Sequence, residues 1–151
     1  MDDQANIDFI KEFYDAYLQG DRERLLSCMA PDIEWDIPSM PGIPFSGKRR
    51  GREQVNEFFR LVGESQQLVR FEPRDFVSQC GRVYVTGRND WKVKATGAGF
   101  STDWVHIFTV KDRQVTGFRQ FMDTHAIVTA YRSDAPSDPD SLPSAHCPAL
   151  H

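Results

Sequence analysis

Hydrophobic residues recur at helical spacing in the first half of the chain. Over residues 7–18 the apolar positions lie three or four residues apart, which predicts an amphipathic helix that ends at Gly20. Asp21 is a typical N-cap for a second, shorter helix, which must end near Pro31 because the residue before proline disfavours helical geometry. A third helix is predicted over residues 52–62. Its inward positions are Val55, Phe58, Phe59 and Val62.

The other segments alternate with the period of strands. In residues 33–37 apolar and acidic residues alternate, so one face is buried and the other faces water. A proline-rich loop with the basic run Lys48, Arg49 and Arg50 follows, and four strands are then predicted over residues 68–78, 81–94, 99–111 and 114–123. Their short turns indicate an antiparallel meander. Helices followed by such a sheet predict the α+β class, with the helices packed on one sheet face.

Composition and charge narrow the function classes. A chain of 151 residues suits one domain, predicted over residues 1–132, and the Ser- and Pro-rich segment 133–151 is expected to be a tail. The net charge of −4 disfavours nucleic acid as a partner. No apolar run is long enough to cross a membrane and the chain begins with acidic residues, so we expect a cytoplasmic protein. Three widely spaced cysteines indicate reduced thiols and no zinc site.

Three segments carry a resemblance to a known family. Residues 30–35 (APDIEW), 51–59 (GREQVNEFF) and 112–123 (DRQVTGFRQFMD), in this order, resemble the SnoaL-like and ketosteroid-isomerase-like proteins of the nuclear transport factor 2 (NTF2) superfamily. The resemblance covers about residues 5–130. It implies a cone-shaped fold in which N-terminal helices pack on a curved antiparallel sheet and enclose a pocket. Members include isomerases, polyketide cyclases, dehydratases, epoxide hydrolases and non-enzymatic binding proteins, and most use neither metal nor organic cofactor, so none is expected here.

His106 is the main catalytic candidate. Its predicted strand carries Phe100, Thr102, Trp104, His106 and Phe108 on one face. The resemblance implies that His106 occupies the position of the isomerase's protonated aspartate. A histidine among aromatic side chains is expected to be neutral and able to transfer protons near neutral pH. The alternative is a histidine whose hydrogen bonds are satisfied within the core.

Two residues of the ketosteroid isomerase site are missing at the matching positions. Ile37 occupies the position of the proton-transferring aspartate, with Asp36 beside it on the opposite face. Phe13 occupies the position of the tyrosine in the first helix, unless Tyr14 or Tyr17 substitutes for it. Ketosteroid isomerisation is therefore disfavoured.

Two sets of polar residues compete for the pocket face of the second meander strand. Arg88 and Asp90 resemble the Arg-x-Asp pair of limonene-epoxide-hydrolase-like proteins, which activates water against an epoxide. Strand alternation instead directs Gly87 and Asn89 toward the pocket, unless a bulge reverses it. If Asn89 faces the pocket, it would hold an oxygen of the substrate together with Gln120 of the last strand.

The predicted pocket is apolar and aromatic. Its expected wall residues are Phe13, Tyr17, Trp35, Ile37, Phe59, Trp91, Trp104, Phe108, Phe118 and Met122. Such a wall fits a small hydrophobic or aromatic molecule. Two functions remain open, a cofactor-independent acid–base enzyme and a non-catalytic binding or assembly module. Val105, Ile107 and Phe121 form an apolar patch on the opposite sheet face, which predicts a homodimer through the sheet.

Overall fold

Four helices frame the part of the protein that the structure, a computed structural model, describes, which is residues 2–132. They are α1 (Asp3–Leu18), α2 (Arg22–Ser27), α3 (Arg52–Ser65) and α4 (Thr124–Arg132). The cap predicted at Asp21 is confirmed, since its side chain accepts a hydrogen bond from the Arg24 backbone N–H at 3.1 Å. Asp123 caps α4 in the same way through the Ala126 N–H at 3.0 Å. The tail predicted over residues 133–151 lies outside the described residues.

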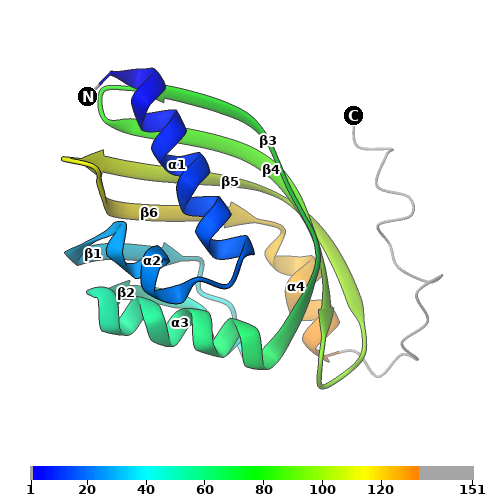
Figure 1. Ribbon diagram of the computed structural model, residues 1–151. Helices are drawn as coiled ribbons and strands as arrows, with labels where there is room; N and C mark the ends of the chain where they lie inside the picture. The colour runs from blue at the N-terminus through cyan, green and yellow to red at the C-terminus, as the bar shows by residue number, and fades with distance from the viewer. Residues whose placement is uncertain (1, 133–151) are drawn as a thin grey trace.

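Six strands form one curved sheet. They are β1 (Met29–Ile37), β2 (Gly47–Arg50), β3 (Gln66–Gln79), β4 (Arg82–Val93), β5 (Gly99–Lys111) and β6 (Gln114–Met122), in the order β2-β1-β6-β5-β4-β3 (Figure 1). The predicted antiparallel meander is confirmed, as β3 pairs with β4, β4 with β5 and β5 with β6. The sheet is nevertheless mixed, because β1 runs parallel to β6.

The first part of the sheet differs from the sequence prediction. β1 begins at Met29 and includes Pro31, and its register against β6 shifts between Met29 and Glu34. Proline donates no ladder hydrogen bond, and such an irregularity accommodates it. The prediction that the basic run lies in a loop was wrong. Residues 48–50 belong to β2, which pairs antiparallel with β1 and places Trp35 opposite Arg49.

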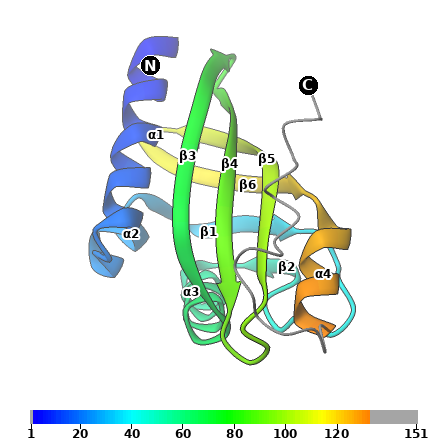
Figure 2. The same cartoon turned by 90° about the vertical axis from the view of Figure 1, so that its right-hand side faces the viewer.

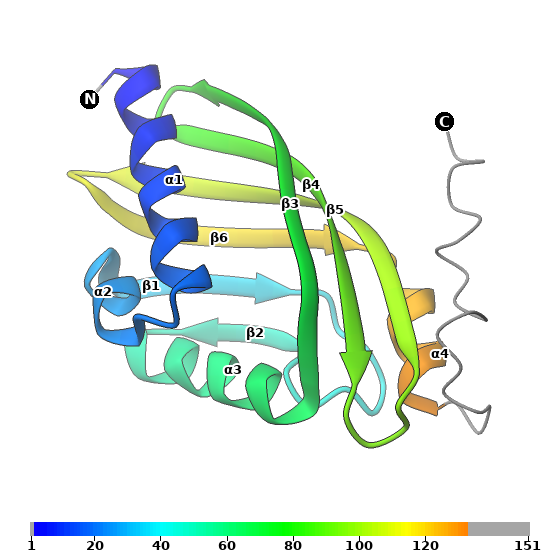
Figure 3. The same cartoon turned by 45° about the vertical axis from the view of Figure 1, so that its right-hand side comes forward.

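The helices lie on the concave side of the sheet and at one end of it. α1 packs against β3 and β4, α3 against β1, β2 and β3, and α4 against β5. Figure 2 shows the long strands β3, β4 and β5 curving toward α3 and α4, and Figure 3 shows α1 crossing the upper strands in front of the sheet. None of the helices among residues 2–132 is long and apolar enough to span a membrane.

Strand alternation decides what enters the interior. Along β5, every second residue from Phe100 to Val110 is buried, while the residues between them are more exposed. Within residues 33–37 of β1 the buried positions are Ile33, Trp35 and Ile37, as the alternation predicted, and Met29 and Ala30 at the start of the strand are buried too. These strands meet the buried sides of α1 and α3 in one core. The interior is rich in aromatic rings, which pack edge to face or stacked and leave irregular spaces between them.

Candidate functional site

A cavity of about 80 Å³ lies between the concave face of the sheet and the helices. This volume is several times the roughly 10–15 Å³ that one water molecule requires. Most of the predicted wall residues line it. They are Phe13, Tyr17, Trp35, Phe59, Trp91, Phe108, Phe118 and Met122.

Two predicted wall residues do not reach the cavity. Ile37 is the last residue of β1 and is enclosed in the core. Trp104 is almost fully buried, and its ring stacks on His106 at 3.9 Å and on Phe71 at 5.4 Å between centroids. Trp104 therefore acts as packing behind the cavity wall.

The cavity contains a buried hydrogen bond between α1 and β5. The Tyr14 hydroxyl lies 2.8 Å from Nδ1 of His106, and both residues line the cavity. Either the phenol O–H donates to Nδ1, or Nδ1–H donates to the phenol oxygen, according to the tautomer of His106. In both cases Nδ1 takes part in this hydrogen bond. Nε2 is thus the ring nitrogen left for a ligand.

Burial keeps both members of this pair uncharged. Desolvation lowers the pKa of His106 from 6.5 to about 3, so the imidazole is neutral at physiological pH. The same effect raises the pKa of Tyr14 well above its usual value, so the phenol keeps its proton. The pair is a neutral hydrogen-bonding unit and does not form an ion pair.

Stacked rings hold the imidazole in one plane. His106 lies nearly parallel to Trp104, at 18° between planes, and meets the edge of Phe118 at 4.9 Å. Gly87 makes this arrangement possible, because a Cβ built there would lie 2.3 Å from the Trp104 ring and 2.6 Å from the carbonyl oxygen of Glu72. A side chain at position 87 would displace the tryptophan that supports His106.

Two amide side chains complete the polar part of the cavity. Gln120 pairs directly across the ladder from His106 and lines the cavity. Asn89 on β4 is only 5% exposed, and its Oδ1 has no hydrogen-bond partner within residues 2–132. The indole nitrogen of Trp35 is likewise buried without a partner in this part of the chain. Buried polar atoms are normally paired, so these two atoms are available to a ligand.

The structure does not bring Asp36, Arg88 or Asp90 to the cavity. Arg88 donates to Asp103 at 3.2 Å, and Asp90 accepts from Ser101 at 2.6 Å. The reason is strand alternation, since the β4–β5 ladder pairs without a register shift and no bulge turns these side chains inward.

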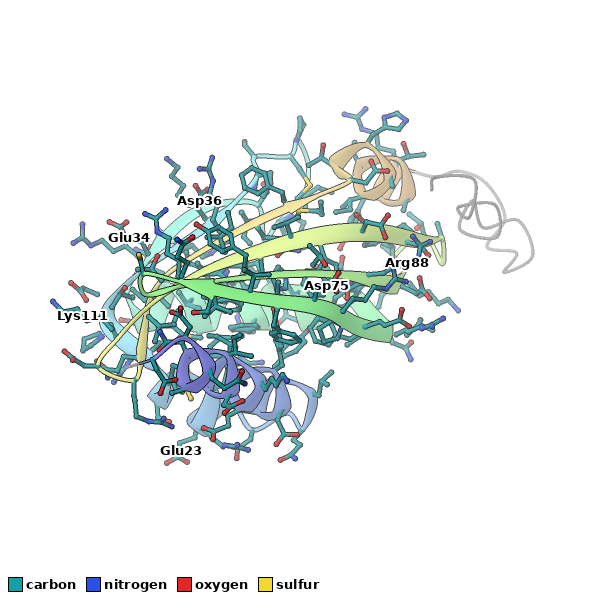
Figure 4. All side chains as sticks on the ribbon, turned by 90° about the horizontal axis from the view of Figure 1, so that it is seen from above. Glu23, Glu34, Asp36, Asp75, Arg88 and Lys111 are labelled. Atoms are coloured by element: carbon teal, nitrogen blue, oxygen red, sulfur yellow. The ribbon has the colours of Figure 1, made fainter. Side chains whose placement is uncertain are left out.

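Asp36 lies outside the cavity for the same reason. It is an outward residue of β1 between the buried Trp35 and Ile37, and its Oδ2 lies 3.7 Å from Nε of Arg119. Figure 4 shows Asp36 on the side of the strands away from α1. The catalytic roles considered for these three residues are not compatible with the cavity as it stands.

From the sequence, Tyr14 was considered only as a substitute for the tyrosine that is missing at Phe13. The comparison with the isomerase directed attention to Phe13, whereas the hydroxyl that reaches His106 comes from the next residue. Helical spacing alone places Tyr14 on the buried side of α1, because it lies four residues after the buried Ile10. Gln66 and Thr102 also line the cavity and were not proposed as site residues.

The described cavity offers hydrogen bonds and apolar surface. None of the lining residues carries a charge at neutral pH, given the neutral His106. Within residues 2–132 no three histidine, cysteine or carboxylate side chains cluster in a way that could hold a metal ion. The arrangement can bind an oxygen-bearing apolar molecule and orient it against Nε2 of His106.

Comparison with known proteins identifies the family. Residues 10–118 match the SnoaL-like domain family. An NTF2-like protein from Burkholderia xenovorans is 36% identical in sequence, with a TM-score of 0.79 over 86% of this chain and 98% of that one. TerC, crystallised with polyporic acid, is 30% identical, with a TM-score of 0.71 over 85% of this chain and 98% of its own.

A third solved structure supports the fold alone. An NTF2-like protein from Burkholderia thailandensis is 24% identical, with a TM-score of 0.77 over 88% of this chain and the whole of that one. No curated protein matches the chain. The family match covers most of the sequence, and the curved sheet with its N-terminal helices agrees with it. The chain therefore belongs to the SnoaL-like family and has the NTF2-like fold.

Proposed function

We propose that the protein is a cofactor-independent enzyme that binds a small aromatic molecule in the cavity and promotes proton transfer from its carbon atoms, with the His106–Tyr14 pair polarising the adjacent carbonyl. The hydrogen bond between these two neutral groups inside an aromatic cavity is the observation that carries this proposal. The similarity to TerC, crystallised with polyporic acid, supports a small organic ligand.

The low pKa of His106 indicates how the pair acts. With a pKa of about 3, forming the imidazolium at pH 7 costs about 5 kcal/mol, so a free charged intermediate on the ring is disfavoured. The favoured state has the Tyr14 hydroxyl donating to Nδ1 and Nε2–H donating to an oxygen of the substrate. A fixed donor in a largely apolar cavity stabilises negative charge that develops on a carbonyl oxygen.

The amide side chains then orient the substrate. Gln120, next to His106 on the neighbouring strand, contacts the same oxygen, while Asn89 holds a second polar group. Polarisation of a carbonyl makes the adjacent C–H acidic. Because the described lining residues offer no carboxylate, solvent or another group of the substrate accepts the carbon-bound proton. Rearrangements that pass through an enol are the reaction class that fits these groups.

Deuterium exchange into 2-tetralone, an aromatic ketone with acidic C–H bonds, tests the proposal. We expect the protein to accelerate exchange in D₂O above the buffer rate, with Tyr14→Phe slower and His106→Gln at the buffer rate, as followed by proton NMR. Lys92→Gln, an exposed change on the outward side of β4, is the control and should match the wild type. Circular dichroism checks that each variant is folded.

The low pKa of His106 also supports a second function, which is ligand binding without turnover. The titratable side chains that line the cavity within residues 2–132 all resist charge, which suits it to binding without turnover. If 2-tetralone binds but exchanges no faster than in buffer, the protein is a non-catalytic binding module and the enzyme proposal is wrong. Native mass spectrometry of freshly purified protein would then identify the retained ligand directly.

A further inference from the structure

None of the cavity-lining residues that the structure describes is an acidic or basic side chain that is charged at neutral pH. The described lining residues are apolar or carry neutral polar groups, and two arginines lie against aromatic rings of the cavity wall. The guanidinium of Arg22 lies 5.2 Å from the Phe59 ring centroid and donates to the side chain of Asn56. That of Arg49 lies 5.5 Å from the Phe58 centroid and donates to the Phe45 carbonyl. Neither arginine is among the lining residues.

Burial opposes ionisation of the groups already inside the cavity. It lowers the pKa of His106 to about 3, raises the pKa of Tyr17 to about 12 against a small opposing effect of Arg22, and raises the pKa of Tyr14. The same desolvation acts on any ionised group that a ligand brings in. An anionic ligand would have to leave water without gaining a cation in return.

Asn89 and His106 lie at two different positions along the β4–β5 ladder. Asn89 pairs with Thr102, and His106 follows Thr102 by four residues on the same face, which separates the two positions by roughly 13 Å at the usual rise of a strand. The Asn89 end adjoins the start of α4, where the Asp123 N–H donates to Thr102 Oγ1 at 2.7 Å. The His106 end meets α1 through Tyr14.

The side-chain oxygen of Asn89 lacks a hydrogen bond that a ligand would supply. Its Oδ1 is buried and has no partner within the described chain, although the residue lines the cavity. An unpaired buried amide oxygen destabilises a folded protein, and a hydrogen-bond donor from a ligand would remove this penalty. An acceptor such as a carboxylate would not.

We propose that the cavity selects uncharged, elongated aromatic compounds that donate a hydrogen bond to Asn89 Oδ1 at one end and present an oxygen to His106 at the other. This inference rests on the proposed function, because it assumes that the cavity is the ligand site. It specifies the substrate class as neutral aromatic compounds with a hydroxyl or N–H group remote from the oxygen that His106 contacts.

Two matched compounds test the selection for the neutral form. Naphthalene-2,6-diol carries a hydroxyl at each end, and 6-hydroxy-2-naphthoate replaces one hydroxyl by a carboxylate. We expect the diol to bind the wild-type protein on the order of tenfold more tightly than the carboxylate in isothermal titration calorimetry at pH 7.

A ligand–variant cycle tests the role of Asn89. In the wild type, the diol should bind about fivefold more tightly than 2-naphthol, which lacks the second hydroxyl. In Asn89→Leu this advantage should disappear, while 2-naphthol itself binds as well as before. A purely structural role of Asn89 would weaken both ligands equally. Lys92→Gln on the same strand should keep the wild-type difference. The wild-type comparison of the two ligands stands even if Asn89→Leu does not fold.

The outcomes separate this inference from the proposed function. If the carboxylate binds as tightly as the diol, or if 2-naphthol equals the diol in the wild type, the selection described here is wrong while the cavity remains the ligand site. If none of the three compounds binds, the cavity is not a site for aromatic molecules, and both proposals are wrong.

Discussion

The two faces of the sheet are built from the same strands but place polar groups in opposite environments. On the concave face, His106, Asn89 and Tyr14 are enclosed by aromatic rings and stay neutral. On the convex face, polar side chains pair as ions near water, as Arg88 does with Asp103 and Arg119 with Asp36. Charge is retained where solvent can stabilise it and is suppressed where the rings exclude solvent.

This difference changes what each face can do. The charged convex residues look more reactive in the sequence, but exposed ion pairs contribute little to stability and lie away from the cavity. The neutral concave residues are fewer, yet the hydrogen bond between Tyr14 and His106 and the stacking of His106 on Trp104 fix the central pair. Substitutions that alter the close packing of the concave face should therefore have much larger effects than substitutions on the convex face.

The largest effect is expected at Gly87. Replacing it with alanine places a Cβ 2.3 Å from the Trp104 ring and 2.6 Å from a backbone oxygen, so we expect a loss of about 3 kcal/mol in the free energy of unfolding. Gly63→Ala is the control, because a Cβ there meets nothing within 4 Å and alanine favours the helix by about 0.5–1 kcal/mol. Urea denaturation measures both. A Gly87→Ala protein as stable as the wild type would show that the stack adapts without strain.

The second effect is a pH dependence caused by His106. Its pKa is about 3 in the folded protein and about 6.5 when exposed, so between these values the unfolded chain binds the extra proton. The stability linked to this residue is therefore complete above pH 6.5 and falls as the pH decreases, by about 2 kcal/mol at pH 5.

His106→Gln isolates this contribution. Among residues 2–132, the imidazole is hydrogen-bonded to Tyr14, packs against the rings of Trp104, Phe108 and Phe118, and lies beside Val85 and Gln120 on the neighbouring strands; none of these side chains titrates in this range. The variant should be less stable at pH 7 but should lose about 2 kcal/mol less than the wild type between pH 7 and pH 5, as measured by urea denaturation at the two pH values. Equal losses in the two proteins would mean that the imidazole is accessible to protons in the folded state.

The smallest effect is expected on the convex face at Asp36. Asp36→Asn removes a partly exposed ion pair with Arg119, and we expect the free energy of unfolding to change by less than about 0.5 kcal/mol. Exchange of 2-tetralone should proceed at the wild-type rate, because this side chain points away from the cavity. Loss of exchange in this variant would return Asp36 to the list of catalytic residues.

The homodimer inferred from the apolar residues of the convex face remains a prediction. Phe121 is exposed and lies under the guanidinium of Arg119 at 4.7 Å, and Val105 and Ile107 are half-buried beside it. The homodimer inferred from these residues is tested by native mass spectrometry, and Phe121→Asp should reduce the dimer fraction if the interface includes this patch.

Local patterns predicted most elements of the fold. The spacing of apolar residues identified α1 and α3, Asp21 marked the start of α2, and alternation located the four strands of the meander. The same alternation separated Asn89 from its neighbours Arg88 and Asp90, because side chains on a regular strand must alternate. The short strand β2 was missed, since a glycine and three basic residues carry no apolar period and become a strand only through pairing with β1.

The sequence by itself thus determined the elements, the side chains that each strand turns inward and the aromatic character of the interior. Only the tertiary structure decided that β1 lies parallel to β6, that Tyr14 and not Phe13 offers the hydroxyl, and that this hydroxyl reaches a histidine 92 residues away. Periodicity is a local property and records which side of an element is buried. The partner that each buried group meets, and the shift in its pKa, depend on how distant elements enclose the same space.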